Sequence, residues 1–175
     1  GVSIIRKSSL PQLAIIWRGP MMSNGLKQMI NDTNWGRLDF LIIDTPPGTG
    51  DVHITLLQEF NITGALVVTT PQLVAKADVQ KVINMLGDKH IGVPILGVVE
   101  NMSWFSPSLH PYEKYFLFGK GGGSDLSNAF NIPLLAQIPI NEKICMACDE
   151  GKLGELFLDN EVLLAFNSIV AQIKS

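Results

Sequence analysis

The chain reads Leu41-Ile42-Ile43-Asp44-Thr45-Pro46-Pro47-Gly48-Thr49-Gly50-Asp51, so an apolar run ends on an acid and passes directly into a proline-glycine turn. In parallel α/β sheets, ligands bind beyond the carboxyl ends of the strands. An acid at such an end can hold a Mg²⁺-bound water beside a terminal phosphate. The stretch therefore predicts a nucleotide site, and its structural alternative is a plain tight turn.

Three residues of this stretch are the candidate catalytic residues. Asp44 is placed to face Mg²⁺ and water, and Gly48, which has no Cβ, lets the backbone approach a phosphate oxygen. Asp51 stands where the next helix should begin, and its alternative role there is that of an N-cap.

Apolar runs alternate with amphipathic segments of helix length along the chain. The expected strands, which are rich in Val, Ile, Leu or Ala, are Leu38–Asp44, Gly64–Thr70, Ile95–Glu100, Leu134–Ile138 and a weaker Val2–Ser8. The expected helices are Met21–Thr33, Asp51–Glu59, Val74–Asp88, Gly123–Phe130 and Glu161–Lys174. The alternation predicts an α/β fold with a mostly parallel sheet, helices on both faces and a single domain over residues 1–175.

Composition narrows the class of protein. Apolar residues make up 46% of the 175 residues and charged residues 17%, so the chain can bury a sizeable core. The net charge of −3 argues against nucleic-acid binding, which needs clustered Lys and Arg. No apolar run approaches the roughly 20 residues that span a bilayer, and no signal segment opens the chain, so we expect a cytoplasmic protein without a membrane partner.

A long irregular stretch, Asn101–Lys120, is expected to follow the strand Ile95–Glu100. It is rich in aromatic residues and includes two prolines. A loop at the carboxyl end of a strand is where such sheets bind ligands, but it can equally cover a sheet edge or pack in a dimer. Asn101 itself offers an amide donor and acceptor that match the edge of an adenine ring, or it is only a turn former.

The stretch Gly119-Lys120-Gly121-Gly122-Gly123-Ser124 imitates a phosphate-binding loop. In the P-loop pattern G-x-x-x-x-G-K-[ST], the lysine and hydroxyl open the helix, whereas here the lysine precedes the glycines. We therefore expect a flexible turn, with contact of Lys120 to an anion across a dimer as the alternative. Arg18, just before Pro20, is either a phosphate or carboxylate partner or a surface arginine.

Cys145 and Cys148 form a Cys-x-x-Cys pair and are the only cysteines of the chain. Thiolates bind soft metals and iron–sulfur clusters, but one pair supplies only two ligands, so a four-ligand site needs a second copy of the chain. The pair can alternatively be redox-active or simply packed in the fold.

Several motifs, taken together and in order, resemble those of the Mrp-type ATPases, which are iron–sulfur cluster carriers among the MinD/ParA-like deviant P-loop NTPases. The matching motifs are Trp17-Arg18-Gly19-Pro20-Met21, Leu41–Asp51, Glu100-Asn101-Met102-Ser103, Phe118-Gly119-Lys120-Gly121-Gly122 and Gln137-Ile138-Pro139. The resemblance covers about Gly1 to Gly151.

The resemblance implies an ATP-dependent carrier. Asp44 would be the switch acid near Mg²⁺ and water, Gly48 would face the γ-phosphate, and Asn101 and the backbone near Pro139 would recognise adenine. It also implies a homodimer, transient carriage of a [4Fe–4S] cluster, and iron–sulfur acceptor or scaffold proteins as partners.

The chain departs from this family at two places. It contains no lysine-bearing phosphate loop, so we expect an amino-terminally incomplete NTPase domain that binds ATP poorly. The position of the family's cluster-binding Cys-x-x-Cys reads Ser106-Pro107-Ser108-Leu109, which leaves Cys145 and Cys148 either as replacement ligands or as unrelated. The alternative function is a non-catalytic dimerisation or interaction module. A membrane-bound regulator is disfavoured because Glu161–Lys174 carries a single lysine.

Overall fold

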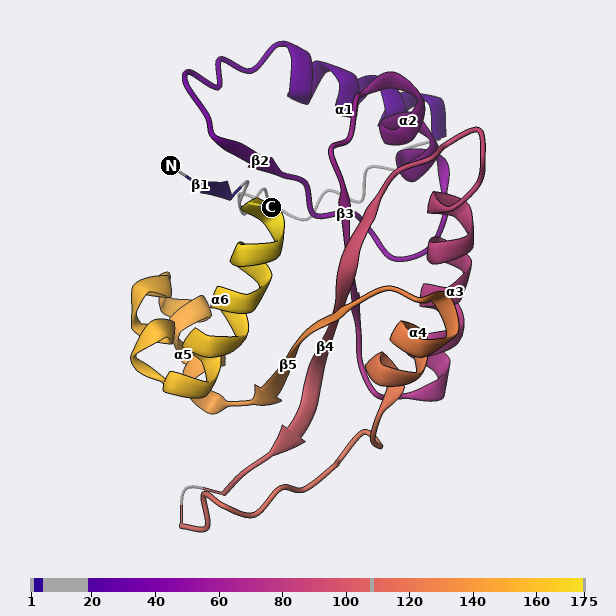
Figure 1. Ribbon diagram of the computed structural model, residues 1–175. Coiled ribbons are helices and arrows are strands. Elements are labelled where there is room, and N and C mark those ends of the chain that lie inside the picture. Colours follow the sequence, from indigo (N-terminus) through magenta and orange to yellow (C-terminus); the bar gives the residue numbers. More distant parts are fainter. Residues whose placement is uncertain (1, 5–18, 108, 175) are drawn as a thin grey trace. The chain divides into compact units, whose positions relative to one another are not determined.

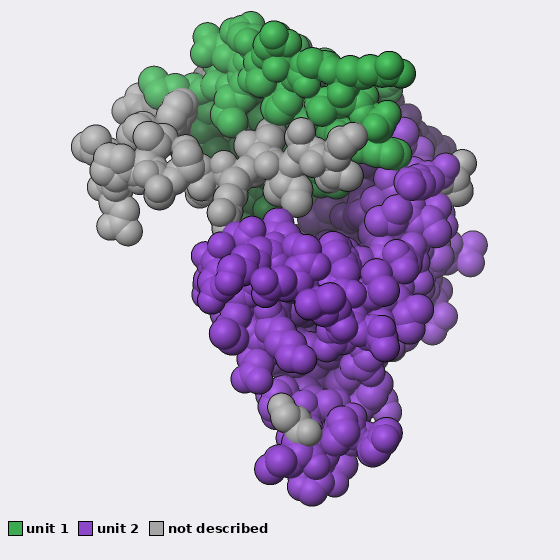
Figure 2. Space-filling model, turned by 90° about the vertical axis from the view of Figure 1, so that its left-hand side faces the viewer, with its two compact units in different colours: residues 1–62 green, residues 63–175 purple. Residues whose placement is uncertain are grey.

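The computed structural model describes residues 2–4, 19–107 and 109–174. The chain divides into two compact units, unit 1 over Gly1–Ile62 and unit 2 over Thr63–Ser175 (Figure 2). Each unit has its own parallel strands, so each is described by itself.

Unit 1 contains a two-stranded parallel sheet and two helices. Its elements are β1 (Val2–Ile4), α1 (Gly19–Asn31), β2 (Phe40–Ile42) and α2 (Asp51–Glu59). The two helices contact each other through polar pairs. The hydroxyls of Ser23 and Thr55 lie 2.6 Å apart, and Lys27 Nζ lies 2.7 Å from Glu59 Oε1.

Unit 2 is built on a three-stranded parallel sheet with strand order β3-β4-β5 (Figure 1). Its elements are β3 (Ala65–Thr69), α3 (Leu73–Leu86), β4 (Ile95–Phe105), α4 (Gly122–Phe130), β5 (Leu134–Ile140), α5 (Glu142–Glu150), η1 (Leu153–Leu158) and α6 (Asn160–Lys174).

The central strand β4 separates two layers of core. Successive side chains of a strand point to opposite faces, so Val98 and Val99, both buried, enter different clusters. The cluster of Val98 includes Ile83 of α3 and Leu126 of α4, whereas that of Val99 includes Ala165 and Ile169 of α6. Figure 1 shows α3 and α4 on one side of the sheet and α6 on the other. The predicted parallel sheet with helices on both faces is thus confirmed.

The structure moves the predicted element boundaries and adds two elements. Helix α2 begins and ends at the predicted residues, and the other expected helices shift by one or two residues at their ends. Helix α5 and the 3₁₀ helix η1 were not expected, because four of the nine residues of α5 are charged and η1 is only six residues long. Strand Val2–Ser8 is described only over Val2–Ile4, since residues 5–18 lie outside the described residues.

Strand β4 is longer than the sequence indicates. Its apolar run ends before Glu100, but pairing with β5 resumes at Phe105, opposite Ile140. The prediction that Asn101 ends the strand is therefore wrong, and residues 101–105 belong to the strand rather than to an irregular loop. Backbone pairing to a neighbouring strand extends β4 although the continuous apolar run is interrupted at Glu100 and Asn101. Within the described part of the chain, the helices lack the length and apolar character needed to cross a bilayer.

We expect Leu126→Ala to lower the free energy of unfolding by about 2–5 kcal/mol, because it leaves a cavity in the layer under α3 and α4. Leu126 is fully buried, whereas Leu164 of α6 is 67% exposed and provides the same substitution as a control. Leu164→Ala should change stability by no more than about 0.5 kcal/mol. Urea unfolding followed by circular dichroism measures both, and equal losses would contradict this account of the core.

Candidate functional site

The predicted catalytic turn lies in unit 1, directly after β2. The strand ends at Ile42, so Asp44 lies beyond it, and its side chain is exposed rather than buried. Gly48 has φ +95°, a conformation that favours glycine, and an added Cβ would meet no atom within 4 Å. Glycine at position 48 is therefore explained by backbone conformation. The roles of Asp44 and Gly48 toward Mg²⁺ and phosphate remain predictions.

Helix α2 starts at the end of this turn. Its N-cap is Gly50, so the N-cap alternative for Asp51 is wrong. Asp51 is instead the first helical residue, where a negative charge stabilises the helix by about 0.3–1 kcal/mol. His53, two residues further along α2, is buried, and burial lowers the pKa of its imidazole, which favours the neutral form.

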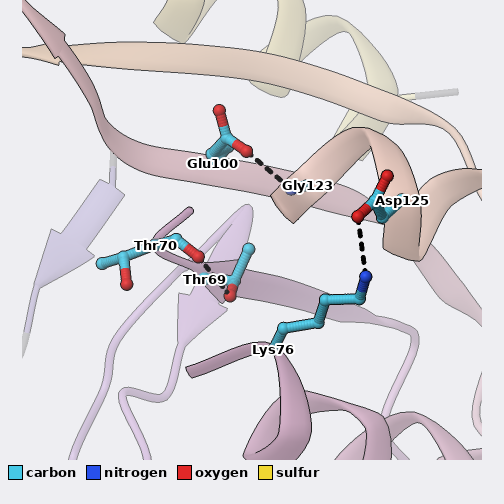
Figure 3. Close-up of polar contacts among 6 residues, drawn as sticks. All are labelled: Thr69, Thr70, Lys76, Glu100, Gly123 and Asp125. Atoms are coloured by element: carbon cyan, nitrogen blue, oxygen red, sulfur yellow. Dashed lines mark hydrogen bonds and ion pairs between the residues drawn. The ribbon is translucent and has the colours of Figure 1, made fainter. Parts of the chain in front are cut away.

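In unit 2, a buried carboxylate lies in the middle of β4, opposite Thr69, the last residue of β3. Glu100 of β4 is 1% exposed, and its Oε2 accepts a 2.6 Å hydrogen bond from the backbone N–H of Gly123 (Figure 3). Its Oε1 accepts a 2.8 Å hydrogen bond from Gln137 Nε2 of β5. A buried carboxylate is costly unless its oxygens are paired, and here both are. The start of helix α4 adds the favourable end of the helix dipole.

Next to Glu100, strand β4 bulges. Asn101 pairs with Ile138 and Phe105 with Ile140, so four steps along β4 match two along β5 (105 − 101 = 4; 140 − 138 = 2). Met102 has φ +57°, and its N–H donates a 2.9 Å hydrogen bond to Asn101 Oδ1.

The buried hydroxyl of Ser103 donates a 2.9 Å hydrogen bond to the carbonyl of Glu100 across this bulge. Bulges and left-handed backbone at non-glycine residues concentrate at functional sites, because they re-aim side chains. No residue pattern indicates this bulge, since it depends on pairing between β4 and β5.

The structure brings two of the predicted base-binding residues onto neighbouring strands. Asn101 pairs with Ile138, the residue before Pro139. Asn101 is half-buried, and its Oδ1 is engaged by Met102, so the Nδ2 group supplies the donors that a ligand would meet. Pro139 is buried in β5. The structure thus provides a matching pair of strand positions, and their contact with adenine remains a prediction.

The glycine-rich stretch is closely packed rather than a flexible turn. Helix α4 begins at Gly122, and an added Cβ there would lie 2.8 Å from the carbonyl oxygen of Pro71. A Cβ on Gly123 would lie 2.8 Å from Glu100 Cβ. These glycines therefore let the start of α4 approach β4 and the β3–α3 connection. The prediction of a flexible turn for this stretch was wrong, because packing against residues far away in the chain cannot be predicted from local composition.

Polar contacts also join the neighbouring helix starts. Lys76 Nζ of α3 lies 2.7 Å from Asp125 Oδ2 of α4 (Figure 3). Thr69 Oγ1, at the end of β3, donates a 3.1 Å hydrogen bond to the carbonyl of Thr70.

Lys120 Nζ lies 4.8 Å from the ring centre of Phe116, a cation–π contact. Its role toward an anion across a dimer stays a prediction.

The two cysteines lie on one helix, three residues apart. Cys145 and Cys148 of α5 are both exposed, so the alternative that they are packed in the fold is wrong. Cys145 Sγ donates a 3.7 Å hydrogen bond to Asp149 Oδ2. The charge of Asp149, and then this hydrogen bond, raise the pKa of the Cys145 thiol. Among the residues that the structure describes, no group of three or more His, Cys, Asp or Glu is arranged to hold a metal ion.

The other predicted cluster position lies on an extended loop. Phe105 and Tyr115 exchange two backbone hydrogen bonds, of 2.9 and 2.8 Å, which close the loop between them. Within it, Ser106 is half-buried and Leu109 is 89% exposed, and neither residue is a thiolate. Ser108 and Arg18 lie outside the described residues, so their predicted roles rest on sequence alone.

Sequence analysis assigned no role to Glu100, Gly123 or Gln137, which form the hydrogen-bonded group around the buried carboxylate. The available signal was an acid immediately after the apolar run Ile95–Val99. A strand buried on both faces places such an acid in the interior, where it needs donors. The identity of those donors, on α4 and β5, follows only from the fold.

The chain is similar to known proteins over nearly its whole length. A family model described as ParA, the NUBPL iron-transfer P-loop NTPases, matches residues 2–174. An iron-sulfur cluster carrier protein from Aquifex aeolicus is 47% identical over 157 residues, which are 89% of this chain and 42% of that protein. The cytosolic Fe-S cluster assembly factor NUBP2 homolog of Trichoplax adhaerens is 43% identical over 162 residues, or 90% of this chain and 60% of that protein.

Among solved structures, a nucleotide-binding protein from Archaeoglobus fulgidus in complex with ADP has a TM-score of 0.69 and 33% identity. The match covers 82% of this chain and 57% of that one. The chain thus spans about two fifths of the Aquifex relative and about three fifths of the other two. The resemblance predicted from the motifs is confirmed. Because the family model matches residues 2–174 and the α/β fold agrees with it, the chain belongs to the NUBPL iron-transfer P-loop NTPase family.

Proposed function

We propose that this chain is part of an ATP-dependent iron–sulfur cluster carrier or assembly protein of the Mrp type. The observation that carries the nucleotide part is the pairing of Asn101 with Ile138, the residue before Pro139, near the carboxyl end of β5 at Ile140. Ligands of parallel sheets bind beyond such ends. Two relatives bear carrier or assembly names, and the solved neighbour is described as a complex with ADP.

In this proposal, the base binds at Asn101 and Pro139 of unit 2. The roles proposed for residues of unit 1 toward phosphate and Mg²⁺ rest on the family resemblance alone. Asp44 and Gly48 face the terminal phosphate, Asp51 opens the following helix, and Arg18 pairs with a phosphate oxygen. Mg²⁺ commonly binds proteins through one or two carboxylates together with substrate phosphates, so the exposed carboxylate of Asp44 fits it. Bound there, Mg²⁺ would neutralise charge on the phosphates.

The cargo is an iron–sulfur cluster held between two copies of the chain. A [4Fe–4S] cluster takes four thiolates, and Cys145 and Cys148 supply two exposed thiols per copy. Binding and hydrolysis of ATP would shift the homodimer between states that hold and release the cluster. Its partners are iron–sulfur scaffold and acceptor proteins, and the location is the cytoplasm, in keeping with the cytosolic assembly factor among its relatives.

A non-catalytic dimerisation or interaction module is the second candidate. Residues 1–175 contain no G-x-x-x-x-G-K-[ST] pattern, so the phosphate cradle of such enzymes is not supplied by this stretch. The loop closed by Phe105 and Tyr115 also presents exposed apolar side chains, including Leu109 and Tyr112. The two candidate functions differ in whether the chain contacts adenine: the ATP-dependent carrier should do so, and the interaction module should not.

Saturation-transfer difference NMR with millimolar ATP and Mg²⁺ detects such contact even when binding is weak. We expect the adenine protons to receive saturation from the chain, and we expect Asn101→Ala to weaken binding about fivefold, the equivalent of one lost hydrogen bond. Asn128→Ala, on the exposed surface of α4, serves as the matched control and should bind as the parent does. No transfer to adenine in the parent would favour the interaction module.

Anaerobic reconstitution with ferrous iron and sulfide tests the cluster ligands. We expect Cys145→Ser and Cys148→Ser each to lower the bound iron and sulfide by at least about half, since each removes two of four thiolates in a symmetric dimer. Met146→Ala, which changes an exposed residue between them, should load as the parent does. Unchanged loading in both serine variants would exclude these cysteines as ligands.

The charge of Asp149 should control the reactivity of Cys145. Because Asp149 raises the pKa of this thiol, the reactive thiolate forms only at higher pH. In a Cys148→Ser background, Asp149→Asn should therefore speed alkylation of Cys145 by iodoacetamide at pH 8 several-fold. The rise of the alkylation rate with pH should also occur at lower pH. Glu150→Gln removes the same charge from a residue whose carboxylate lies 2.8 Å from Lys152 Nζ, and should have little effect. Equal rates for parent and Asp149→Asn would contradict the assignment.

A further inference from the structure

We propose that Glu100 is a positioning residue of the nucleotide-base site. It would fix Asn101 against the strand that carries Pro139, and so set the preference for adenine over guanine. This inference rests on the proposed nucleotide function and deepens it. It names a residue that does not contact the ligand but determines where the contacting residue lies.

The carboxylate of Glu100 joins three elements. Its Oε2 accepts from the N–H of Gly123 at 2.6 Å and its Oε1 from Gln137 Nε2 at 2.8 Å, so β4 is tied to the start of α4 and to β5. The fit is close, because even one Cβ on Gly123 would lie 2.8 Å from Glu100 Cβ. With both oxygens engaged and the residue 1% exposed, Glu100 is not available to a ligand. Its role is therefore positional rather than catalytic.

Glu100 directly precedes Asn101, which is the last regularly paired residue before the bulge between Asn101 and Phe105. Its carbonyl accepts the 2.9 Å hydrogen bond from Ser103 Oγ, and Asn101 Oδ1 accepts from the N–H of Met102, whose φ is +57°. A non-glycine residue in this region persists only when its surroundings hold it there. The side chain of Glu100 fixes the strand position directly before Asn101, and the bulge starts after Asn101. A change in its hydrogen bonds should therefore alter the direction of the Asn101 amide.

The same hydrogen bonds fix the opposite strand. Gln137 pairs with Glu100 in the β4–β5 register and directly precedes Ile138, the partner of Asn101. Glu100 thus aligns both strands at the step before the proposed base contacts. A well-packed apolar side chain commonly serves stability as well as a buried ionic group does, so stability alone does not call for a carboxylate at this position.

Binding of ATP and GTP by the full chain tests the proposal, with ligand-observed NMR titrations to obtain both affinities. Glu100→Ala should weaken ATP binding about fivefold, the equivalent of one misplaced hydrogen bond, and should leave GTP and inorganic tripolyphosphate unchanged. Glu100→Gln keeps the shape and an acceptor for Gly123, and the amide of Gln137 can turn to accept from it. This conservative variant should restore most of the preference for ATP.

A purely structural role would give a different pattern. Leu156→Ala changes a buried residue of a separate core cluster, so it should lower stability without changing the ratio of ATP to GTP affinity. If Glu100→Ala does not fold, Gln137→Ala removes one of the two donors at a mostly exposed position and should lower the ATP preference in part. The double variant Glu100→Ala, Asn101→Ala should bind ATP no more weakly than Asn101→Ala alone.

Each outcome decides one of the two claims. A parent chain without adenine contact would overturn the nucleotide function and this inference with it. A parent that binds ATP, while Glu100→Ala and Gln137→Ala keep its preference over GTP, would overturn only the role of Glu100. Additive losses in the double variant would do the same, because they would show that Asn101 acts independently of Glu100.

Discussion

Pairing of one buried carboxylate is the constraint on which unit 2 depends. Glu100 lies in the central strand of the sheet, and its two oxygens are bonded to Gly123 at the start of α4 and to Gln137 of β5. Without either donor, burial of the carboxylate would be strongly unfavourable. The start of α4 and strand β5 must therefore both pack against β4 at Glu100. Glycine at 122 and 123 follows from this requirement, since a Cβ at either position would collide with neighbouring atoms of β4 or the β3–α3 connection.

The same arrangement relates the core to the proposed base site. Val98 and Val99 divide the core into two layers, and the next two residues of the strand carry polar side chains, Glu100 inside and Asn101 at the half-buried bulge. The two polar residues therefore follow directly on the apolar part of β4 that forms the core, and Asn101 is the proposed base contact. The register with β5 places Pro139 one residue beyond the partner of Asn101, so a rigid core fixes the geometry of both positions.

The proposed cluster ligands present a different situation. Cys145 and Cys148 lie on the exposed surface of α5, outside the sheet, and the charge of Asp149 disfavours the thiolate that binds iron. Binding of iron would itself favour loss of the proton, so loading of this pair should depend on pH and on the second copy of the chain. The position where the resemblance implies cysteines, between Phe105 and Tyr115, instead presents exposed apolar side chains such as Leu109.

The parallel α/β class, most elements to within a few residues, and the family could be predicted from the sequence, because apolar periodicity and ordered motifs are local properties of a chain. The sequence also indicated Asn101 and Pro139 as candidates. Three features become visible only in the folded chain: β4 continues to Phe105, it bulges after Asn101, and Gly122 and Gly123 are required by close packing. These features arise from contacts between residues far apart in the chain, such as Glu100 with Gly123 and Gln137. Such contacts cannot be predicted from local composition, since a buried acid forms hydrogen bonds to its donors only after the strands and the helix have packed together.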